Sequence, residues 1–434
     1  MPEILTYPSA AAEDMISTIL GRGLDYRDAD YEKVSAMVDD VRARGDAAVL
    51  EYTRRFDAPE MTTGLVRATE EEIEDAAEKV DPEFMSALNR AASQIESFHR
   101  RQVRNSWIST DRHGVVLGQL VNPVDAAGIY VPGAKGGTTP LVSSVLMGAI
   151  PAAIAGVPRI VMVTPPMADC SINPHLLAAA RAAGVSEVYK TGGAWAVAAL
   201  AYGTETILPV DVIAGPGNIY VTLAKKIVSG MVGIDMTAGP SEVLVVADES
   251  ADPACVAADL LSQAEHDPLS SAVLVAASES LAQKVCTEID SQLAELSRRD
   301  IAEKSLAEYG AVFTVPDLET AMALANRIAP EHLELQVKEP FAWLHSVKNA
   351  GAVFLGGYTP EPVGDYVAGP NHVLPTGGTA RFSSALSVDC FVKQTSVVYY
   401  SKQAFLNEAG DVIRLAETEG LSAHAGSVKK RYFL

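Results

Sequence analysis

The sequence contains few cysteines, and their placement excludes two kinds of site. The four lie far apart, with no CxxC pair among them: Cys170, Cys255, Cys286 and Cys390. A thiol redox motif or a cysteine zinc site would need closely spaced pairs. Scattered single cysteines are typical of a reducing compartment, where they pack as small apolar side chains. We therefore expect a cytoplasmic protein.

The sequence predicts neither a targeting segment nor a membrane span. The N-terminal stretch MPEILTYPSAAAEDM has no basic region followed by an apolar run, so no signal peptide is predicted. One uncharged stretch of 23 residues, 136–158, is long enough to cross a bilayer. It holds four Thr and Ser residues and has Pro151 near its middle, and no second such stretch exists. A buried helix packed on a sheet explains it better than a membrane span.

Basic residues are the minority among the charges. The chain has 34 Lys and Arg against 55 Asp and Glu, which gives a formal charge of −21. The electrostatic field of this net negative charge repels nucleic acid and anionic membranes, so we expect neither as a partner. With 434 residues, of which 48% are hydrophobic, the chain has the composition of an ordinary globular protein with two large domains or three smaller ones. This composition favours an enzyme that acts on a small molecule.

The first 110 residues have helical patterns. Apolar residues recur at helical spacing between positions 30 and 56. Thr69 and Glu72 match a capping box, which starts another helix. Asp81 before Pro82 is a further helix start, because aspartate caps a helix and proline is tolerated at its first position.

From about residue 115, short apolar strands alternate with alanine-rich helices, which predicts a parallel sheet with helices on its faces. A first set of strands is predicted at 128–131, 159–164, 187–190, 211–214 and 242–247. A second α/β set follows, with strands at 271–276, 311–315 and 351–355. A loop rich in Gly, Pro and Thr spans 357–384, and such long loops in compact enzymes are commonly functional. The tail 403–434 is predicted to be helical.

Gly and Pro concentrate at the ends of predicted strands, in VPGAKGGTTP, TPP, TGG, AGPGN and AGPS. Parallel sheets bind ligands outside the carboxyl ends of their strands, and glycine-rich turns expose backbone N–H groups to an anion. Asn218 of AGPGN is a candidate cap for the helix that follows. Five such turns on one edge favour a nucleotide or phosphate ligand over ordinary tight turns. Neither GxGxxG nor GxxxxGK followed by Ser or Thr is present, so neither standard nucleotide motif applies.

Histidine is rare, with eight in the chain, and it marks the candidate metal ligands. Gln263 and His266 are three residues apart on a predicted helix, so they project from one face. Both side chains can bind zinc, although this pair alone is a weak signal. The other candidates are His332, Asp365, His372 and His424.

An acid and an imidazole stand side by side at Glu331 and His332, just after Pro330 interrupts a helix. They could supply two proton-transfer groups to one pocket. Alternatively, the glutamate caps the helix and the histidine lies at the surface. Glu419 and His424 are five residues apart, about 140° around a regular helix. They can converge only at a helix end or in irregular backbone.

Nine long motifs occur in order along the chain: IYVPG (129–133), SSVLMGAIPAAIAGV (143–157), AALAYGTETI (198–207), GPGN (215–218), IDMTAGPSEVLVVAD (234–248), DLLSQAEH (259–266), RIAPEHLEL (327–335), GDYVAGPNHVLPTGGTARFSS (364–384) and EGLSAHAGSVKKR (419–431). In these motifs the chain resembles the L-histidinol dehydrogenase family over nearly its whole length. Their number and order make the resemblance highly specific.

The resemblance implies a fold, a reaction and an assembly. The fold is α/β, with two Rossmann-like parallel-sheet domains and small helical segments at both ends, in a domain-swapped homodimer. The implied boundaries are an N-terminal helical segment 1–26, a zinc and catalytic domain of 27–129 plus 240–384, an NAD domain 130–239, and a C-terminal helical segment 385–434 that reaches the partner subunit. The reaction is the two-step oxidation of L-histidinol through L-histidinal to L-histidine, with NAD as cofactor and one zinc ion per subunit.

The resemblance also implies the roles of individual residues. Zinc would be bound by Gln263, His266, Asp365 and, from the partner subunit, His424. His332 would accept the alcohol proton, and Glu331 would activate water to hydrate the aldehyde. The substrate would contact these zinc ligands together with His332, Ser241 and Glu419. NAD would contact Tyr130, Trp195 and Asn218. His372 would be a structural neighbour of the site.

Two departures from the family leave other functions open. Trp195 stands in GGAWA, where the family has a glutamine that contacts NAD. The loop from Tyr130 to Ser143 is longer than expected, and its Lys135 would suit a sulfonate. The alternative is a dehydrogenase of the same fold for another small alcohol, such as sulfopropanediol. A zinc hydrolase with Glu331 as its base and a nucleotide-binding protein without catalysis are further alternatives.

Overall fold

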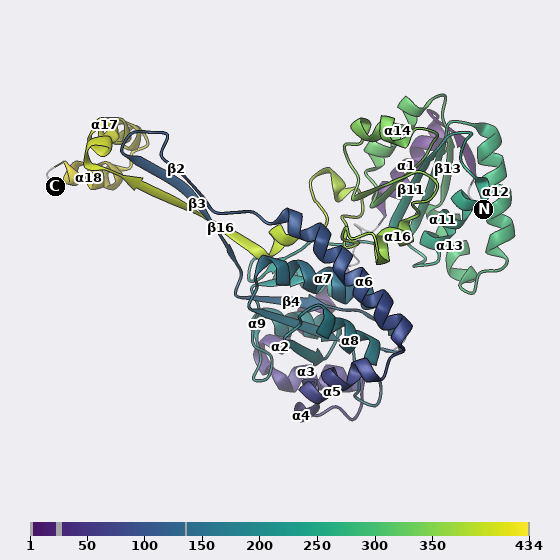
Figure 1. Ribbon diagram of the computed structural model, residues 1–434, viewed down its shortest axis with the longest axis horizontal. Helices are drawn as coiled ribbons and strands as arrows, with labels where there is room; N and C mark the ends of the chain where they lie inside the picture. The colour runs from purple at the N-terminus through teal and green to yellow at the C-terminus, as the bar shows by residue number, and fades with distance from the viewer. Residues whose placement is uncertain (1–2, 23–27, 135–136, 433–434) are drawn as a thin grey trace. The chain divides into compact units, whose positions relative to one another are not determined.

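The chain forms two compact units (Figure 1). The structure is a computed structural model that describes residues 3–22, 28–134 and 137–432. The larger unit comprises Met1–Gln102 and Asp125–Phe391, and the smaller unit comprises Val103–Val124 and Val392–Leu434. The larger unit contains two parallel sheets of six and five strands. This confirms the predicted α/β fold with two parallel sheets.

The six-stranded sheet is parallel throughout. Its order is β1 (Ile4–Thr6), β13 (Ala311–Thr314), β12 (Ser271–Ala276), β11 (Glu242–Ala247), β14 (His332–Gln336) and β15 (Ala352–Leu355). In Figure 1 the purple N-terminal segment lies among the green elements of this sheet, since β1 pairs with β13. The strand order reverses between β11 and β14, and such reversals are where α/β sheets bind ligands.

Alternating side chains of this sheet are buried in two apolar layers, as in Val243 and Leu244 of β11. Three helices cover one face: α11 (Pro253–Ala264), α12 (Glu279–Leu293) and α13 (Arg299–Tyr309). Two helices cover the other face: α1 (Ala10–Gly21) and α14 (Leu318–Ile328). Because both faces are buried, the strands are continuous apolar runs, which is why the sequence predicts most of them.

The five-stranded sheet is also parallel, in the order β10 (Gly233–Ile234), β9 (Val212–Ala214), β4 (Ala126–Tyr130), β7 (Arg159–Thr164) and β8 (Glu187–Lys190). One apolar core joins it to four helices: α2 (Asp28–Arg44), α3 (Asp46–Phe56), α9 (Gly193–Tyr202) and α10 (Ile219–Val228). Three further helices form another layer: α6 (Pro82–His99), α7 (Val142–Ala155) and α8 (Pro174–Ala182). Of these, α7 contacts the sheet, and α6 and α8 pack against α7. The strand order reverses between β4 and β9.

The remaining elements of the larger unit are short. They are α4 (Thr63–Val66), α5 (Glu70–Asp75), η1 (Ala76–Glu78), η2 (Arg100–Gln102), β5 (Gly133–Ala134), β6 (Thr139–Pro140), α15 (Pro340–Trp343), η3 (Leu344–Ser346), α16 (Glu361–Tyr366), η4 (Thr379–Arg381) and η5 (Val388–Phe391). Of these, α16 and η4 lie within the loop 357–384.

The helix signals of the N-terminal region hold in the structure. Thr69 and Glu72 form a complete capping box at α5, and Asp81 caps α6. The helix predicted over 30–56 is two helices, because Gly45 separates α2 from α3 with a φ of +56°. Glycine adopts this left-handed conformation without the strain that a side chain would add.

The uncharged stretch 136–158 contains the buried helix α7, as predicted. Among the described residues, no helix is long and apolar enough to cross a membrane.

Sheet membership differs from the predicted domain boundaries. The boundaries implied by the resemblance join 27–129 to 240–384, whereas α2, α3, α6 and β4 lie with the five-stranded sheet. The segment 1–26 is expected to be helical and separate, but β1 and α1 complete the six-stranded sheet and one of its apolar layers. Strand 242–247 belongs to the second set of strands rather than the first. Periodicity identifies buried faces but not their neighbours, so these pairings are beyond its reach.

The smaller unit holds an antiparallel sheet that the sequence patterns do not predict. β3 (Val115–Pro123) pairs with β16 (Val392–Tyr400) and with β2 (Trp107–Ser109). The helices α17 (Lys402–Thr418) and α18 (Ser422–Arg431) follow β16. The segment 385–434 is therefore not wholly helical. Most of β16 is exposed, so no buried apolar run marks it as a strand.

Candidate active site

Two rows of polar side chains face each other between the six-stranded sheet and α11. β14 supplies the first row, which alternates with two leucines: His332, Glu334 and Gln336. These residues pair in register with the side of β11 that packs under α11. α11 and the turn after it supply the second row: Asp259, Gln263 and His266. The Gln336 amide donates to Asp259 across the gap, at 3.4 Å.

His332 is the central side chain of this cluster and is 3% exposed. Its Nδ1 lies 2.9 Å from the carbonyl oxygen of Glu242. A carbonyl can only accept, so Nδ1 carries the proton and Nε2 keeps its lone pair. Nε2 is buried without a hydrogen-bond partner, and burial lowers the pKa of His332. The imidazole is therefore a neutral base with one free nitrogen.

Glu331 precedes His332 and shares a reciprocal pair of hydrogen bonds with Glu242. The Glu242 N–H donates to Glu331 Oε2 at 2.9 Å, and the Glu331 N–H donates to Glu242 Oε2 at 3.2 Å. Glu331 Oε2 also lies 3.7 Å from His332 Nδ1. Burial raises the pKa of Glu331 well above its usual value. Once ionised, it is a stronger base than an exposed carboxylate.

The short helix α16 brings two more carboxyl groups to the cluster, from Glu361 and Asp365. Their spacing of four residues places both on one helix face. Each has an oxygen 3.9 Å from His332 Nε2. The candidate ligand atoms of these three side chains all lie within 4.8 Å of one another. Burial, and then the Asp365 charge, raises the pKa of Glu361 to about 9.

The sequence patterns do not single out Glu361, Glu334 or Asp259, which form a buried acidic chain behind His332. The Glu361 N–H donates to Glu334 Oε1 at 2.9 Å. Burial raises the pKa of Glu334 to about 8. Two signals could have revealed this chain. One is the four-residue spacing of Glu361 and Asp365, and the other is the alternation of polar residues along 332–336.

Three of the four predicted zinc ligands belong to the larger unit. Asp365 is part of the cluster described above, and Gln263 is 1% exposed with an Oε1 that has no hydrogen-bond partner. His266 follows α11 and is exposed. His372 also has a buried Nε2 without a partner. Repulsion from His372 and His266 adds to the burial that disfavours a charge on His332. Buried polar atoms without partners are rare in folded proteins, and a cation would satisfy them.

Glu419 and His424 lie in the smaller unit, and both are exposed. α17 ends at Thr418, and Glu419 caps it ahead of Gly420, which has a φ of +73°. The pair therefore spans a turn between two helices, the kind of helix end that its five-residue spacing requires. Neither residue is part of the cluster in the larger unit.

Ser241 is partly buried at the amino end of β11. Its carbonyl accepts a hydrogen bond from the Ser271 N–H at 3.0 Å. The turn AGPS therefore precedes a strand of the six-stranded sheet, whereas the other four glycine-rich turns follow β4, β7, β8 and β9. The prediction that all five turns share one edge is wrong. The polar cluster lies at the amino ends of β11 and β14, opposite to the usual ligand edge.

The four other turns line a cavity of about 590 Å³ at the carboxyl ends of the five-stranded sheet. It lies where the strand order reverses between β4 and β9. The three predicted NAD residues all line it: Tyr130, Trp195 and Asn218. Its size suits a small-molecule ligand. Lys135, in the long loop after β4, lies outside the described residues.

Tyr130 and Asn218 place polar atoms at this cavity. The Tyr130 hydroxyl accepts from the Gly193 N–H at 3.0 Å, and burial raises its pKa. Asn218 caps α10 through its side-chain oxygen, as predicted. The AGPGN turn itself is held by a buried ion pair. Lys225 Nζ donates to the Gly215 carbonyl at 2.9 Å, and the Gly215 N–H donates to Asp235 at 2.8 Å.

Trp195 lines the cavity as an apolar wall. Its Nε1 donates to Thr53 Oγ1 at 3.1 Å, and its ring stacks on Phe56 with centroids 5.3 Å apart. Because tryptophan has one donor and no acceptor, Trp195 offers a ligand a surface but no hydrogen bond.

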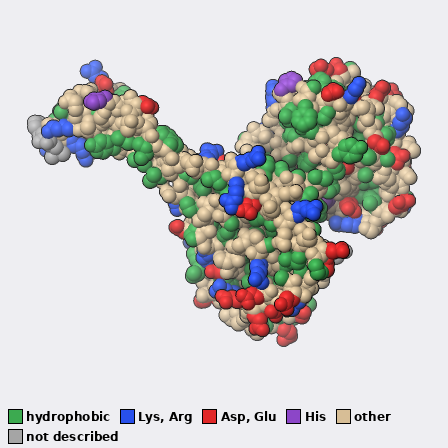
Figure 2. Space-filling view, viewed as in Figure 1, with side chains coloured by type: hydrophobic (Ala, Val, Ile, Leu, Met, Phe, Trp, Pro, Cys, Tyr) green, Lys and Arg blue, Asp and Glu red, His purple; other side chains and the backbone are tan. Residues whose placement is uncertain are grey.

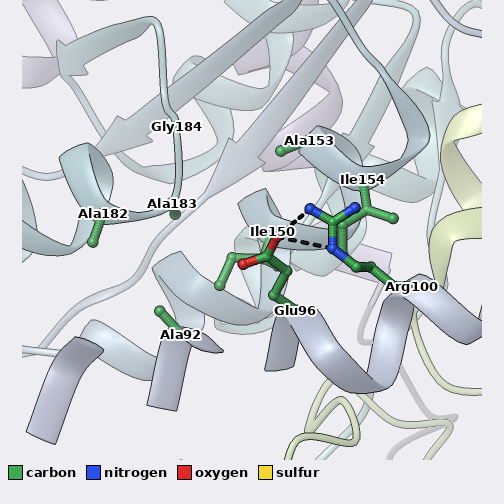
Figure 3. Close-up of a pocket in the computed structure, with 9 residues that line it drawn as sticks. All are labelled: Ala92, Glu96, Arg100, Ile150, Ala153, Ile154, Ala182, Ala183 and Gly184. Carbon is green, nitrogen blue, oxygen red and sulfur yellow. Dashed lines mark hydrogen bonds and ion pairs between the residues drawn. The ribbon is translucent and has the colours of Figure 1, made fainter. Parts of the chain in front are cut away.

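A second hollow of about 310 Å³ lies between α6, α7 and the end of α8 (Figure 3). Alanine and isoleucine side chains line most of it. Its one charged pair is Arg100 and Glu96, which turn toward each other. Because Arg100 and Glu96 pair with each other and the other lining residues are Ala, Ile and Gly, this hollow offers no group for catalysis.

Comparison with known proteins identifies the family. A sequence model described as histidinol dehydrogenase matches residues 23–432. The chain belongs to the histidinol dehydrogenase family. A protein of Desulfotalea psychrophila with that name is 56% identical over 391 residues, 90% of each chain. One of Heliobacterium mobile is 54% identical over 431 residues, 99% of each chain. A solved structure, histidinol dehydrogenase from Elizabethkingia anophelis, is 38% identical, with a TM-score of 0.92 over 99% of this chain and 98% of that one. The resemblance based on nine motifs is confirmed.

Proposed function

We propose that this chain oxidises L-histidinol through L-histidinal to L-histidine, in two NAD-dependent steps that end histidine biosynthesis. The observation behind the proposal is His332, a buried neutral imidazole whose free Nε2 faces two carboxyl groups while Glu331 lies at its other nitrogen. Oxidation of an alcohol and hydration of an aldehyde each require the removal of a proton, and an imidazole and a carboxylate can act as the two bases. Relatives named histidinol dehydrogenase at 54–56% identity support this reaction.

In the first step, the alcohol loses its hydroxyl proton as a hydride leaves the adjacent carbon. His332 accepts that proton at Nε2, because Nδ1 already donates to the Glu242 carbonyl. The Asp365 carboxylate, with an oxygen 3.9 Å from Nε2, stabilises the charge that forms on the ring. NAD, when bound, supplies the hydride acceptor.

In the second step, the aldehyde must be hydrated before another hydride can leave. Glu331 removes a proton from the attacking water. One of its oxygens is held by the Glu242 N–H, which fixes the carboxylate while the other oxygen acts as base. Burial raises the pKa of Glu331, so its carboxylate, once ionised, is a stronger base for this role than an exposed one.

A zinc ion fits the donor set near this pair. The ligands would be Gln263, His266, Asp365 and, from a second copy of the chain, His424. The unpartnered Gln263 Oε1 supports a cation at this position, and nitrogen and oxygen donors with one carboxylate suit zinc. When bound, zinc would hold the amine and imidazole nitrogens of the substrate and so orient its carbinol carbon. Ser241 and Glu419 are the remaining substrate contacts in the proposal.

NAD would occupy the cavity on the five-stranded sheet. Tyr130 and Asn218 offer polar atoms, and Trp195 offers a flat apolar wall where the family resemblance implies a glutamine. Stacking against the dinucleotide can replace an amide contact there.

The smaller unit supports a homodimer. Its buried apolar side chains, among the described residues, are two valines and four alanines: Val115, Val124, Ala404, Ala409, Ala416 and Ala425. So small a core cannot stabilise a folded unit by itself. Figure 2 shows hydrophobic side chains grouped over this unit, and its large exposed apolar residues include Trp107, Ile108, Val398, Tyr399 and Leu415. A second copy that covers them would also place His424 and Glu419 at a neighbouring site. We also propose a cytoplasmic location, because scattered single cysteines are typical of a reducing compartment.

The test is the absorbance of NADH when histidinol is added to the zinc-loaded protein with NAD. The expected yield is two NADH per histidinol, with histidine as product. A zinc hydrolase or a binding protein would give no NADH. An enzyme for sulfopropanediol would respond to that diol alone, and the names of the relatives do not support it.

A further inference from the structure

A buried arginine lies behind the catalytic pair, and the proposed mechanism does not use it. Arg22 follows the last turn of α1 and is 4% exposed, which is rare for arginine. Its Nη2 donates to Glu242 Oε1 at 2.7 Å and to the Pro240 carbonyl at 3.2 Å. Burial lowers the pKa of Arg22. Burying a cation is costly, and only an ion pair with good geometry offsets that cost.

That partner, Glu242, contacts both catalytic residues through its backbone. Its N–H donates to Glu331, and its carbonyl accepts from His332 Nδ1. Its carboxylate accepts from Arg22, from the Glu331 N–H and from the Gly377 N–H at 2.9 Å. One residue therefore orients the water-activating carboxylate and sets the tautomer of the base. Among the described residues, Arg22 is the cation paired with it.

Arg22 also fixes the turn that carries Ser241. The guanidinium holds Pro240 on one side of Ser241 and Glu242 on the other. If Arg22 were lost, Glu242 would be a buried carboxylate next to Glu331 without its paired cation. Two such groups repel, and the side chain of Glu242 would have to take up a proton or move.

We propose that Arg22 is a positioning residue for the reaction, acting through Glu242 on Glu331, His332 and Ser241. The proposal rests on the function proposed above for the catalytic pair. It predicts that Arg22 affects the chemical steps rather than NAD binding, since the NAD cavity lies on the other sheet.

The experiment compares Arg22→Met and Arg22→Lys with a matched control, Arg327→Met. Arg327 also ties down α1, through Glu13 at 2.6 and 2.8 Å, but that pair is exposed and does not contact Glu242. The kcat and KM values are measured for histidinol and for histidinal at saturating NAD, and the KM for NAD separately. Thermal unfolding is recorded for every variant.

For Arg22→Met, kcat should fall about 10- to 100-fold with both substrates, because misplacing catalytic groups by about 1 Å costs that much. The KM for NAD should stay within about twofold. Arg22→Lys should recover part of kcat, since it keeps the charge but not the guanidinium geometry with which Nη2 reaches both Glu242 and the Pro240 carbonyl. Arg327→Met should keep the wild-type kcat. A folded Arg22→Met variant with wild-type kcat would overturn the inference.

A double-mutant cycle with Glu242→Gln tests the route. If Arg22 acts through Glu242, Arg22→Met should cost no more than about threefold in the Glu242→Gln background. An undiminished loss there would place the action of Arg22 elsewhere. If Arg22→Met does not fold, Arg22→Lys replaces it in the cycle, and its effect on kcat is compared between the wild-type and Glu242→Gln backgrounds. A wild-type protein without histidinol-dependent NADH would refute the proposed function, whereas active wild type with unaffected Arg22 variants would refute this inference alone.

Discussion

Replacing Glu331 with glutamine should separate the two oxidation steps. The substitution keeps the size of the side chain, and its amide oxygen can still accept from the Glu242 N–H, so the loop and β14 should keep their geometry. What disappears is the basic oxygen. Since only the aldehyde has to be hydrated, the loss should fall on the second step.

The size of the loss follows from the role of the group. A positioned general base contributes about 10²- to 10⁴-fold, or about 2.7–5.4 kcal/mol of transition-state stabilisation. We expect the oxidation of histidinal to slow by that factor. Oxidation of histidinol depends on His332 Nε2, which Glu331 does not contact, so it should slow by less than about tenfold. Histidinol should then yield one NADH quickly and the second slowly.

The assay is single-turnover NADH formation, started with histidinol in one series and with histidinal in the other. Glu334→Gln is a matched control, because Glu334 is buried on the same strand and bonds to the Glu361 N–H instead of Glu242. Glu361→Gln is the competing candidate, since its carboxyl lies beside His332 Nε2. Equal slowing of both steps in Glu331→Gln would refute the assignment. An aldehyde-specific loss in Glu361→Gln alone would transfer the role to Glu361.

Three further outcomes are expected. Verified removal of metal should abolish activity and zinc should restore it, since a ligand set without thiolate exchanges metal readily; full activity without metal would contradict the zinc site. Mixing inactive His424→Ala and His332→Ala proteins after reversible dissociation should restore about a quarter of wild-type activity, because half of the dimers then carry one intact site; no recovery in proven heterodimers would place His424 outside a shared site. Folding raises the pKa of Glu334 from 4.5 to about 8, so between these values the folded state binds an extra proton. Glu334 should therefore lower the stability of the metal-free wild type there by about 1.4 kcal/mol per pH unit as pH rises, and the pH slope measured by urea unfolding should be smaller by that amount in Glu334→Gln.

The buried parts of the fold could be predicted from the sequence, because burial on both faces produces apolar runs. Strands 159–164, 242–247 and 271–276 match the structure residue for residue. β14 is the exception among the central strands. Its polar residues alternate with leucines directly after a helix that ends at Ile328, and the adjacent Glu331 and His332 draw attention to chemistry rather than to a strand. The polar residues that make β14 hard to recognise as a strand are the same residues that line the site.

The candidate site could be predicted only in pieces. Gln263 and His266 share a helix face, and Glu331 and His332 are adjacent, so local spacing reveals each pair. Nothing local connects the two pairs, because their proximity depends on β14 lying beside β11 under α11. Glu242 and Arg22 are harder still, since 220 residues separate them in the chain. Contacts of that length come from the fold and leave no periodicity in the sequence.

The strands of the smaller unit were not predicted, for a different reason that bears on assembly, whereas its helical tail 403–434 was predicted and is found as α17 and α18. Hydrophobic periodicity predicts an element when its apolar face is buried within the same chain. In β16 and α17 the large apolar residues, such as Val398, Tyr399 and Leu415, stay exposed, and alanines make up much of what is buried. An isolated unit with this surface should not be stable in water, so the exposed apolar residues need a partner. A partner that is a second copy of the chain would supply the missing core and also bring His424 and Glu419 to an active site. The exposure of these apolar residues hides the strand from sequence analysis and also supports a shared site. The mixing of inactive variants tests whether His424 acts in the active site of the partner subunit or in that of its own subunit.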